Sequence, residues 1–321
     1  MGSLLEVNHL KKYFRTPEGY LHAVDDVSFK IKEGETLGVV GESGCGKSTL
    51  GRTIIHLLEP TEGEIFFDGE DISSVSKKEA KDLRKNMQMI FQDPFSSLNP
   101  RKTLRQIISE PMLIYKTCGK NEIAGKVKEL MDTVGLAQRF VEAYPHELDG
   151  GRRQRIGIAR ALALNPRFIV CDEPVSALDV SIQAQILNLM QDLQEERRLT
   201  YMFITHNLSV VKHISNEICV MYLGKILEQA PTKTLFHAPY HPYTKGLLAA
   251  IPRISTNNTA RVKALLKGEL SSPINPKPGC RFAPRCEFAT DACRQQDPPL
   301  CEVEPDHFVA CHRVKELNGL H

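Results

Sequence analysis

The chain has 321 residues, with 41 Lys and Arg against 39 Asp and Glu, and therefore a formal net charge of +2. This length predicts a main domain with a smaller appendage, and the spread of basic residues along the chain argues against nucleic acid as the principal partner. No run approaches the roughly 20 apolar residues of a membrane helix. The first residues, Met1 to Val7, lack the basic stretch and apolar core of a signal peptide, so we expect the chain to stay in the cytosol.

The first two thirds of the chain have the pattern of an α/β domain. From Leu4 to about Ala230, short apolar runs alternate with helical stretches. The early segments Val27 to Ile31 and Glu64 to Phe67 are predicted as members of an antiparallel sheet beside the main one. The segment Glu35 to Val40 is predicted as a strand of the main sheet, and it leads into a glycine-rich turn.

That turn matches the P-loop pattern between a strand and a helix, and its residues are Gly41, Glu42, Ser43, Gly44, Cys45, Gly46, Lys47, Ser48 and Thr49. Glycines allow the backbone to curl so that its N–H groups face phosphates, and the helix N-terminus adds a dipole that favours anions. We expect Lys47 to reach the outer phosphates and the Ser48 hydroxyl to bind Mg²⁺.

A second strand, Arg167 to Cys171, delivers the acidic pair Asp172 and Glu173. Asp172 is the expected outer-shell Mg²⁺ carboxylate, and Glu173 is placed to orient the attacking water or accept its proton. An acidic pair after a strand is common on its own, but together with the P-loop it indicates nucleotide hydrolysis.

Two helical stretches surround this strand. Helices dominate between about Pro100 and Leu164, which predicts an inserted helical subdomain at about residues 95–165. The helix after Asp179 is predicted to be amphipathic, and its core-facing stripe is Ile182, Ile186, Leu189 and Leu193.

Four further motifs carry a resemblance to the ABC ATPases. The run Leu148 to Arg155, with Asp149, Gly150 and Gly151 near its start, resembles the ABC signature L-S-G-G-Q-x-Q-R. Gln92 resembles the Q-loop glutamine, Ser176 to Asp179 the D-loop, and His206 the switch histidine. The resemblance implies a P-loop ABC ATPase core, with a RecA-like sheet, an antiparallel β subdomain and an inserted helical subdomain.

The same resemblance implies roles for single residues in binding ATP and Mg²⁺. Gln92 would sense Mg²⁺ and the attacking water, and His206 would contact the γ-phosphate. Phe14 fits the family's spacing for the aromatic that stacks on adenine, with Tyr13 as its close neighbour. ABC proteins bind ATP between two such domains, so the signature residues Asp149, Gly150 and Gly151 would face the P-loop of a partner.

Asp149 departs from the family pattern, which has Ser at this position. Asp caps a helix N-terminus about as well as Ser, so the stability of the helix that begins here is not expected to fall. An ionised Asp can only accept hydrogen bonds, however, whereas the serine donates one to the partner's γ-phosphate. The sequence therefore predicts an asymmetric pair in which the site using this signature is weak.

The remaining motifs resemble the C-terminal extension of oligopeptide and dipeptide importer ATPases. They are His241 to Thr244, Leu247, Leu248, Pro252, the run Gly268 to Pro278, and Gly279 to Phe282. Leu98 to Arg101, after the Q-loop, also fits this subfamily, and within it the chain resembles the F-type member of the pair. The boundary is predicted between an ATPase domain, 1–232, and an extension, 233–321.

The resemblance to these importers implies partners and a location. They are a second homologous ATPase subunit, two membrane permease subunits and, indirectly, a solute-binding protein, with this chain peripheral on the inner face of the membrane. The alternative is a soluble or regulatory ABC-type ATPase that is not coupled to transport.

Five of the nine cysteines crowd the end of the chain. In a reducing cytosol such a crowd indicates a metal or cluster rather than disulfides. The wide spacings disfavour zinc, and the alternatives to a cluster are zinc and free or oxidised thiols. The importer resemblance implies a four-iron, four-sulfur (4Fe-4S) cluster held by Cys280, Cys286, Cys293 and Cys311, with Cys301 left over.

Overall fold

The computed structural model describes residues 2–251 and 272–320, which fall into two compact units. Unit 1 is Met1–Leu4, Ile31–Glu35 and Ser74–Ile204, and unit 2 is Leu5–Lys30, Thr36–Ser73 and Thr205–His321. Pro252 and residues 268–271, which contribute to the resemblance to peptide importers, lie outside the described residues. In the described part of the chain, no helix combines the length and the apolar character needed to cross a bilayer.

Unit 1 contains three parallel strands, β6 (Met87–Ile90), β7 (Phe168–Asp172) and β8 (Thr200–Thr205). Ile90 lies opposite Cys171, and Asp172 lies opposite Ile204. Every residue of β7 and β8 is buried, as expected for parallel strands that are covered on both faces. β7 begins and ends one residue later than the predicted strand, so Asp172 is its last residue.

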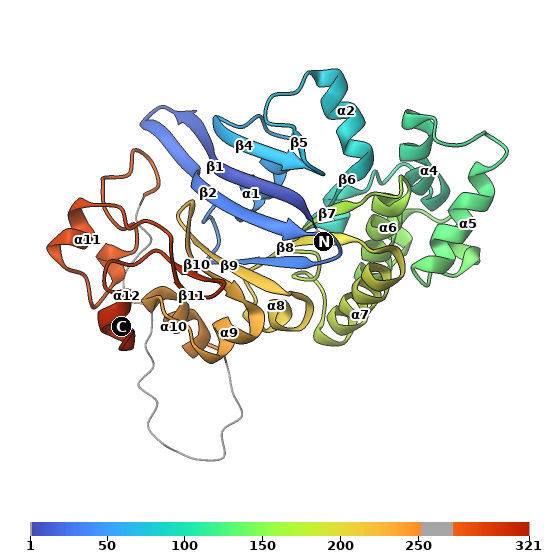
Figure 1. Ribbon diagram of the computed structural model, residues 1–321. Helices are drawn as coiled ribbons and strands as arrows, with labels where there is room; N and C mark the ends of the chain where they lie inside the picture. The colour runs from blue at the N-terminus through green and yellow to red at the C-terminus, as the bar shows by residue number, and fades with distance from the viewer. Residues whose placement is uncertain (1, 252–271, 321) are drawn as a thin grey trace, which may run out of the picture. The chain divides into compact units, whose positions relative to one another are not determined.

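Three helices of unit 1 fall within residues 95–165, where the helical subdomain is predicted, and Figure 1 shows them side by side in green. α4 (Leu104–Tyr115), α5 (Ile123–Thr133) and α6 (Gly150–Leu162) pack on one another. Between them run the 3-10 helices η1 (Gln138–Phe140) and η2 (Pro145–Glu147). Before them come α2 (Lys77–Asn86) and the short α3 (Pro94–Ser97).

The predicted helix after Asp179 is α7 (Val180–Arg197), and the Asp179 carboxylate caps it by accepting the Ile182 N–H at 3.0 Å. Its buried face differs from the predicted stripe and consists of Ile186, Leu187, Met190 and Leu193. Ile182 and Leu189 are only half-buried. The predicted stripe was therefore partly wrong, because a helical repeat of 3.6 residues allows neighbouring positions to share one face.

Unit 2 holds the predicted antiparallel sheet, and this prediction is confirmed. β1 (Ser3–Thr16), β2 (Gly19–Lys32), β4 (Glu62–Phe67) and β5 (Glu70–Asp71) pair in the order β2-β1-β4-β5. From Asp25 onward, buried and more exposed residues alternate along β2, with Val27 and Phe29 in the core. That alternation is typical of a sheet with one covered face.

A second group of strands in unit 2 positions the P-loop. β3 (Thr36–Val40) runs parallel to β9 (Glu217–Tyr222), and β9 pairs with β10 (Lys225–Pro231) through a tight turn. β12 (His307–Val309) pairs with β10, and β11 (Cys301–Glu304) lies on the edge. The last strands of the chain therefore extend the sheet that carries β3.

Within residues 2–251 and 272–320, unit 2 also contains seven helices. These are α1 (Lys47–Ile54), α8 (Leu208–Ile214), α9 (Thr232–His237), α10 (Pro242–Ala249), the 3-10 helix η3 (Ala283–Arg285), α11 (Asp291–Gln295) and α12 (Val314–Asn318). The unit continues through residues 232 and 233, and the domain boundary placed there stays a prediction.

A buried polar cluster joins β10 to the last strands. The Glu228 carboxylate on β10 is fully buried, and it lies 2.8 Å from Nε2 of the equally buried His307 on β12. It also accepts the backbone N–H groups of Tyr240 and His241, at 2.7 and 3.0 Å. Because a buried charge is costly unless it is paired and hydrogen-bonded, these contacts hold three segments together.

Candidate functional site

The P-loop has the geometry that phosphate binding requires. It follows the fully buried strand β3 and ends in α1, whose N-cap is Gly46 at φ 103°. A Cβ atom at Gly46 would lie 1.9 Å from the carbonyl oxygen of Ala23, so only glycine fits there. The loop therefore presents backbone N–H groups at a helix N-terminus, which is a site for anions.

Lys47 is the first residue of α1, and its side chain is folded back over the loop. Its ammonium group donates to the carbonyl oxygens of Gly41 and Glu42 at 2.8 and 2.9 Å, and it lies 3.6 Å from Sγ of Cys45. Burial raises the pKa of the Cys45 thiol, so it stays protonated inside the loop.

Two residues that the sequence motifs did not assign to the site hold Glu42 in the P-loop. The Tyr243 hydroxyl accepts the Glu42 backbone N–H at 3.0 Å. The Arg285 guanidinium pairs with both carboxylate oxygens of Glu42, at 2.7 and 3.1 Å. Arg285 is 243 positions away along the chain, so no local signal could have identified it.

The two candidate aromatics near the start of the chain have different surroundings. The Tyr13 ring stacks on His22, with 3.9 Å between centroids, and its hydroxyl donates to the Asp25 carboxylate. Burial and that hydrogen bond raise the pKa of Tyr13. Phe14 is half-buried, and the Lys12 ammonium lies 5.0 Å from its ring centroid. Tyr13 is thus part of the framework, and Phe14 is the better candidate to stack on adenine.

The switch histidine, His206, follows the last residue of β8 and is exposed. The next residue, Asn207, caps α8 by accepting the Ser209 N–H at 2.9 Å. His206 therefore lies in the short connection between the buried strand β8 and the capped helix α8.

In unit 1, the acidic pair ends β7 as expected. Asp172 is fully buried, and Glu173 is half-buried with φ 46°, a backbone conformation that is uncommon for a residue other than glycine. The Glu173 N–H donates to the Ile204 carbonyl at 2.9 Å, and its own carbonyl accepts the Ser176 hydroxyl at 3.1 Å. Residues held in such a conformation cluster at functional sites.

The structure brings two of the predicted catalytic residues into direct contact. The Gln92 side-chain amide donates to a carboxylate oxygen of Glu173 at 3.1 Å, although 81 positions separate them. An amide that holds a carboxylate in this way can orient it toward a water molecule.

Asp149 caps the signature helix α6, as the sequence predicts. Its carboxylate accepts the Arg152 N–H at 2.8 Å and forms an ion pair with the Arg152 guanidinium at 2.7 Å. Arg153 does not share this role, because its buried guanidinium donates to the Pro145 carbonyl at 2.6 Å and stacks on Phe95. Of these two arginines, Arg152 is therefore the one whose charge offsets that of Asp149.

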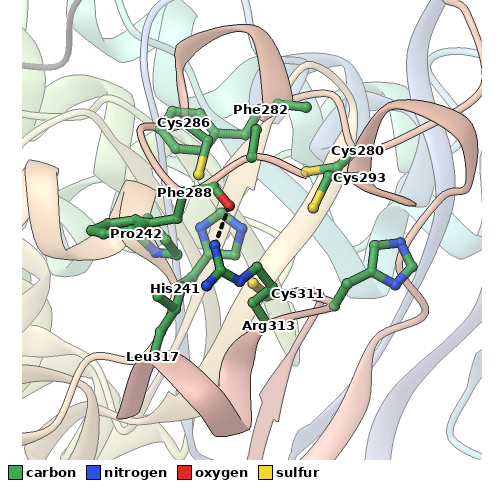
Figure 2. Close-up of a pocket in the computed structure, with 13 residues that line it drawn as sticks. His241, Pro242, Cys280, Phe282, Cys286, Phe288, Cys293, Cys311, Arg313 and Leu317 are labelled. Carbon is green, nitrogen blue, oxygen red and sulfur yellow. Dashed lines mark hydrogen bonds between the residues drawn. The ribbon is translucent and has the colours of Figure 1, made fainter. Parts of the chain in front are cut away.

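The four cysteines assigned to the cluster line one small cavity of about 20 Å³ in unit 2. Figure 2 shows Cys280, Cys286, Cys293 and Cys311 around this cavity, with Arg313 beside them. Cys301, which the predicted set of cluster ligands does not include, is exposed on β11 and does not line the cavity. As it stands, the cavity has room for about one water molecule, so a larger group would require its walls to move apart.

The thiols of this cavity do not meet at one point, as the ligands of a single metal ion would. Across residues 2–251 and 272–320, no three His, Cys, Asp or Glu side chains are grouped so that they could hold a metal ion. Burial raises the pKa of Cys280 to about 11, and it also raises the pKa values of Cys286 and Cys311. The structure thus gives no direct support to the predicted iron–sulfur cluster.

Two family models match the chain. The model described as "ABC transporter" matches residues 24–176, and that described as "Oligopeptide/dipeptide transporter, C-terminal region" matches residues 227–293. The first match contains the P-loop, Gln92, the signature and the acidic pair, and the second contains three of the four cavity cysteines.

Several curated proteins are similar to this chain over nearly its whole length. The oligopeptide transport ATP-binding protein AppF of Bacillus subtilis is 55% identical, with 97% of each chain covered. The oligopeptide transport ATP-binding protein OppF of Haemophilus influenzae is 51% identical, again with 97% of each chain covered. The dipeptide transport ATP-binding protein DppF of the same organism is 48% identical over 97% of each chain.

Solved structures of ATP-binding cassettes match most of the chain. CbiO1 of Clostridium perfringens, part of the ABC transporter complex CbiONQ, is 28% identical with a TM-score of 0.66, covering 74% of this chain and 92% of its own. The cassette MJ0796, solved as a dimer in a post-hydrolysis state with ADP and Pi, is 31% identical with a TM-score of 0.65, covering 71% of this chain and 98% of its own.

Proposed function

This chain belongs to the ABC transporter ATP-binding proteins that carry the oligopeptide/dipeptide C-terminal region, and from that premise we propose that it powers the import of oligopeptides or dipeptides. It is an ABC transporter ATPase. The observation that carries the peptide assignment is the similarity to AppF, OppF and DppF over 97% of the chain, which includes the C-terminal region as well as the ATPase motifs.

In the proposed ATP site, Mg²⁺ enters with ATP as part of the substrate. The P-loop residues 41–49 cradle the phosphates, with Lys47 on the outer ones and Ser48, Gln92 and Asp172 on the magnesium side. Glu173, held by Gln92, positions the water that attacks the γ-phosphate and accepts its proton. His206 contacts the γ-phosphate, Phe14 stacks on adenine, and Asp149, Gly150 and Gly151 serve the partner's site.

The proposed partners follow from this division of each ATP site between two chains. A second homologous ATPase supplies the ordinary signature. Two permease subunits bind the ATPase pair at the inner face of the membrane. A solute-binding protein delivers peptide to the permease subunits at the outer face. The dimeric state of MJ0796 supports the pairing of two ATPase chains.

Uptake of a labelled peptide tests the proposed function. Cells that lack this chain should lose uptake, and the wild-type chain should restore it. Lys47→Ala should not, because the lysine charge on the outer phosphates is lost. Uptake that continued without the chain, or that Lys47→Ala restored in full, would favour an ABC-type ATPase with another role.

Asp149→Ser is expected to raise the ATPase activity of the isolated chain. In a homodimer both sites would use Asp149, and at about 4 Å its charge repels a phosphate charge by roughly 1 kcal/mol in water, or about fivefold in rate. Asp149 pairs with Arg152, so part of this repulsion is already offset. ATPase rates at matched dimer content measure the gain.

Asp192→Ser is the matched control, since Asp192 is exposed on α7 and far in sequence from the signature. It should leave the rate unchanged. If Asp149→Ser dimerises as well as the wild type without any gain in rate, then Asp149 is not the cause of a weak site.

We also propose that the cysteine cavity holds a 4Fe-4S cluster once assembled in the cell. Four thiols on one cavity are the donor set such a cluster requires, and cluster ligands bind different iron atoms, so they surround a space instead of meeting at one point. The thiols must lose their protons to bind iron, and Arg313 beside them favours the resulting negative charge. The cluster would supply a structural cross-link between segments around residues 280 and 311.

Cys293→Ser is expected to abolish iron and sulfide binding, whereas Cys301→Ser should leave both unchanged. Cys293 is buried at the cavity, while Cys301 is exposed on β11. Protein purified without oxygen should be brown, with broad absorbance near roughly 400 nm and with iron and sulfide in similar amounts. Colourless protein that contains one zinc per chain would refute the cluster and favour zinc.

A further inference from the structure

The P-loop carries a carboxylate, and that carboxylate is held by the C-terminal region of unit 2. Both Glu42 oxygens pair with Arg285 of η3, at 2.7 and 3.1 Å, and the Arg285 side chain is only 6% exposed. The same guanidinium lies 3.4 Å from the Tyr222 hydroxyl at the end of β9. Such a bidentate pair is the geometry in which arginine binds a carboxylate most firmly.

A second contact fixes the backbone of the same P-loop residue. The fully buried Tyr243 of α10 accepts the Glu42 N–H through its hydroxyl. Its ring packs against Tyr222 and Phe282, with ring centroids 4.9 and 5.4 Å away. Two segments that follow the ATPase motifs in sequence therefore hold both the charge and the backbone of Glu42.

The charge of Glu42 opposes what the loop is expected to bind. A carboxylate in a phosphate-binding loop repels the negative phosphates, and a guanidinium paired with it removes most of that repulsion. Lys47, which bonds to the Glu42 carbonyl, cannot serve this purpose because it is needed on the phosphates themselves.

We infer that Arg285 is a positioning residue for ATP binding, which neutralises Glu42 and fixes the first turn of the P-loop from the C-terminal region. The inference rests on the proposed phosphate-binding role of residues 41–49. Arg285 immediately precedes Cys286, which lines the cysteine cavity.

A charge cycle on the full-length chain tests this role. Arg285→Gln should weaken ATP binding about fivefold or more, because Glu42 then stands uncompensated beside the phosphates. Glu42→Gln removes the carboxylate that Arg285 neutralises, so in this background Arg285→Gln should have little further effect. The double variant Glu42→Gln with Arg285→Gln should therefore bind ATP within about twofold of Glu42→Gln alone, and more tightly than Arg285→Gln. In hydrolysis assays Arg285→Gln should raise KM for ATP and leave kcat within about twofold.

Controls separate failure of the inference from failure of the proposed site. Lys245→Gln removes an exposed charge of α10 and should leave ATP affinity unchanged. Lys47→Ala should abolish ATP binding; if it does not, the proposed phosphate site is wrong whatever Arg285 does. If Lys47→Ala loses binding while Arg285→Gln binds normally, the inference about Arg285 fails.

Two outcomes decide whether charge is the reason for the role of Arg285. A double variant as weak as Arg285→Gln overturns the proposal, because neutralising Glu42 would then not matter. If Arg285→Gln alone does not fold, Glu42→Gln is compared with the double variant. Equal ATP affinities support the proposal, and a clear difference between them refutes it.

Discussion

Glu173→Gln is expected to lower ATP turnover by about two orders of magnitude or more and to leave ATP binding intact. The amide keeps the size of the side chain but cannot take a proton from the attacking water. The hydrogen bond from Gln92 persists if the new amide offers its oxygen, so the geometry of the site is conserved. Because hydrolysis is blocked while ATP stays bound, the ATPase pair should accumulate in its ATP-bound, dimeric form.

Turnover in the assembled transporter and ATP affinity measured on the same preparation test this expectation. Glu196→Gln makes the same change at an exposed position of α7 and should have no effect on either quantity. Normal turnover in the Glu173→Gln complex would mean that another group activates the water.

The largest effect on stability is expected at Glu228. Glu228→Ala should lower the free energy of unfolding by about 3–5 kcal/mol, since each buried donor that is left without an acceptor costs about 1–3 kcal/mol. It would leave His307 and the N–H groups of Tyr240 and His241 without the acceptor that all three share. Glu228→Gln, which keeps the shape and one acceptor oxygen, should lose less.

The midpoint of urea unfolding, interpreted at constant slope, measures these losses. Glu59 is an exposed carboxylate of the same unit, and Glu59→Ala should change the free energy of unfolding by no more than about 0.5 kcal/mol. A loss below about 1 kcal/mol for Glu228→Ala would show that the cluster does not hold the last strands in place.

The features that the sequence predicts well have causes within a few residues. The P-loop is recognisable because glycines, a lysine and a hydroxyl must follow one another at fixed spacing. The helix starts at Asp149 and Asp179 were predictable for the same reason, since a cap acts on N–H groups only two or three residues away. Alternation along β2 likewise marks a strand whose two faces meet different surroundings.

Contacts between distant segments leave no such local mark. Glu228 resembles a surface residue in the sequence, and its complete burial is tolerable because His307, 79 positions later, and two backbone N–H groups surround its carboxylate. Tyr13 and Phe14 are neighbours with similar rings, and the difference between them depends on Asp25 and His22, which lie on another strand. The predicted buried stripe of α7 was partly wrong because the packing partners, and not the helical repeat alone, decide which positions are buried.

The exposed thiol of Cys301 bears on how dimers of this protein are judged. β11 is an edge strand, and the carboxylates of Glu302 and Glu304 discourage a second copy from pairing with its open backbone. A disulfide needs no such pairing, so two chains exposed to air can be joined at residue 301. A dimer of that kind would have the expected mass but would not need ATP, and it would persist after nucleotide is removed. Measurements of ATP-driven association therefore belong in reductant or in a Cys301→Ser background, where any dimer that remains depends on non-covalent contacts.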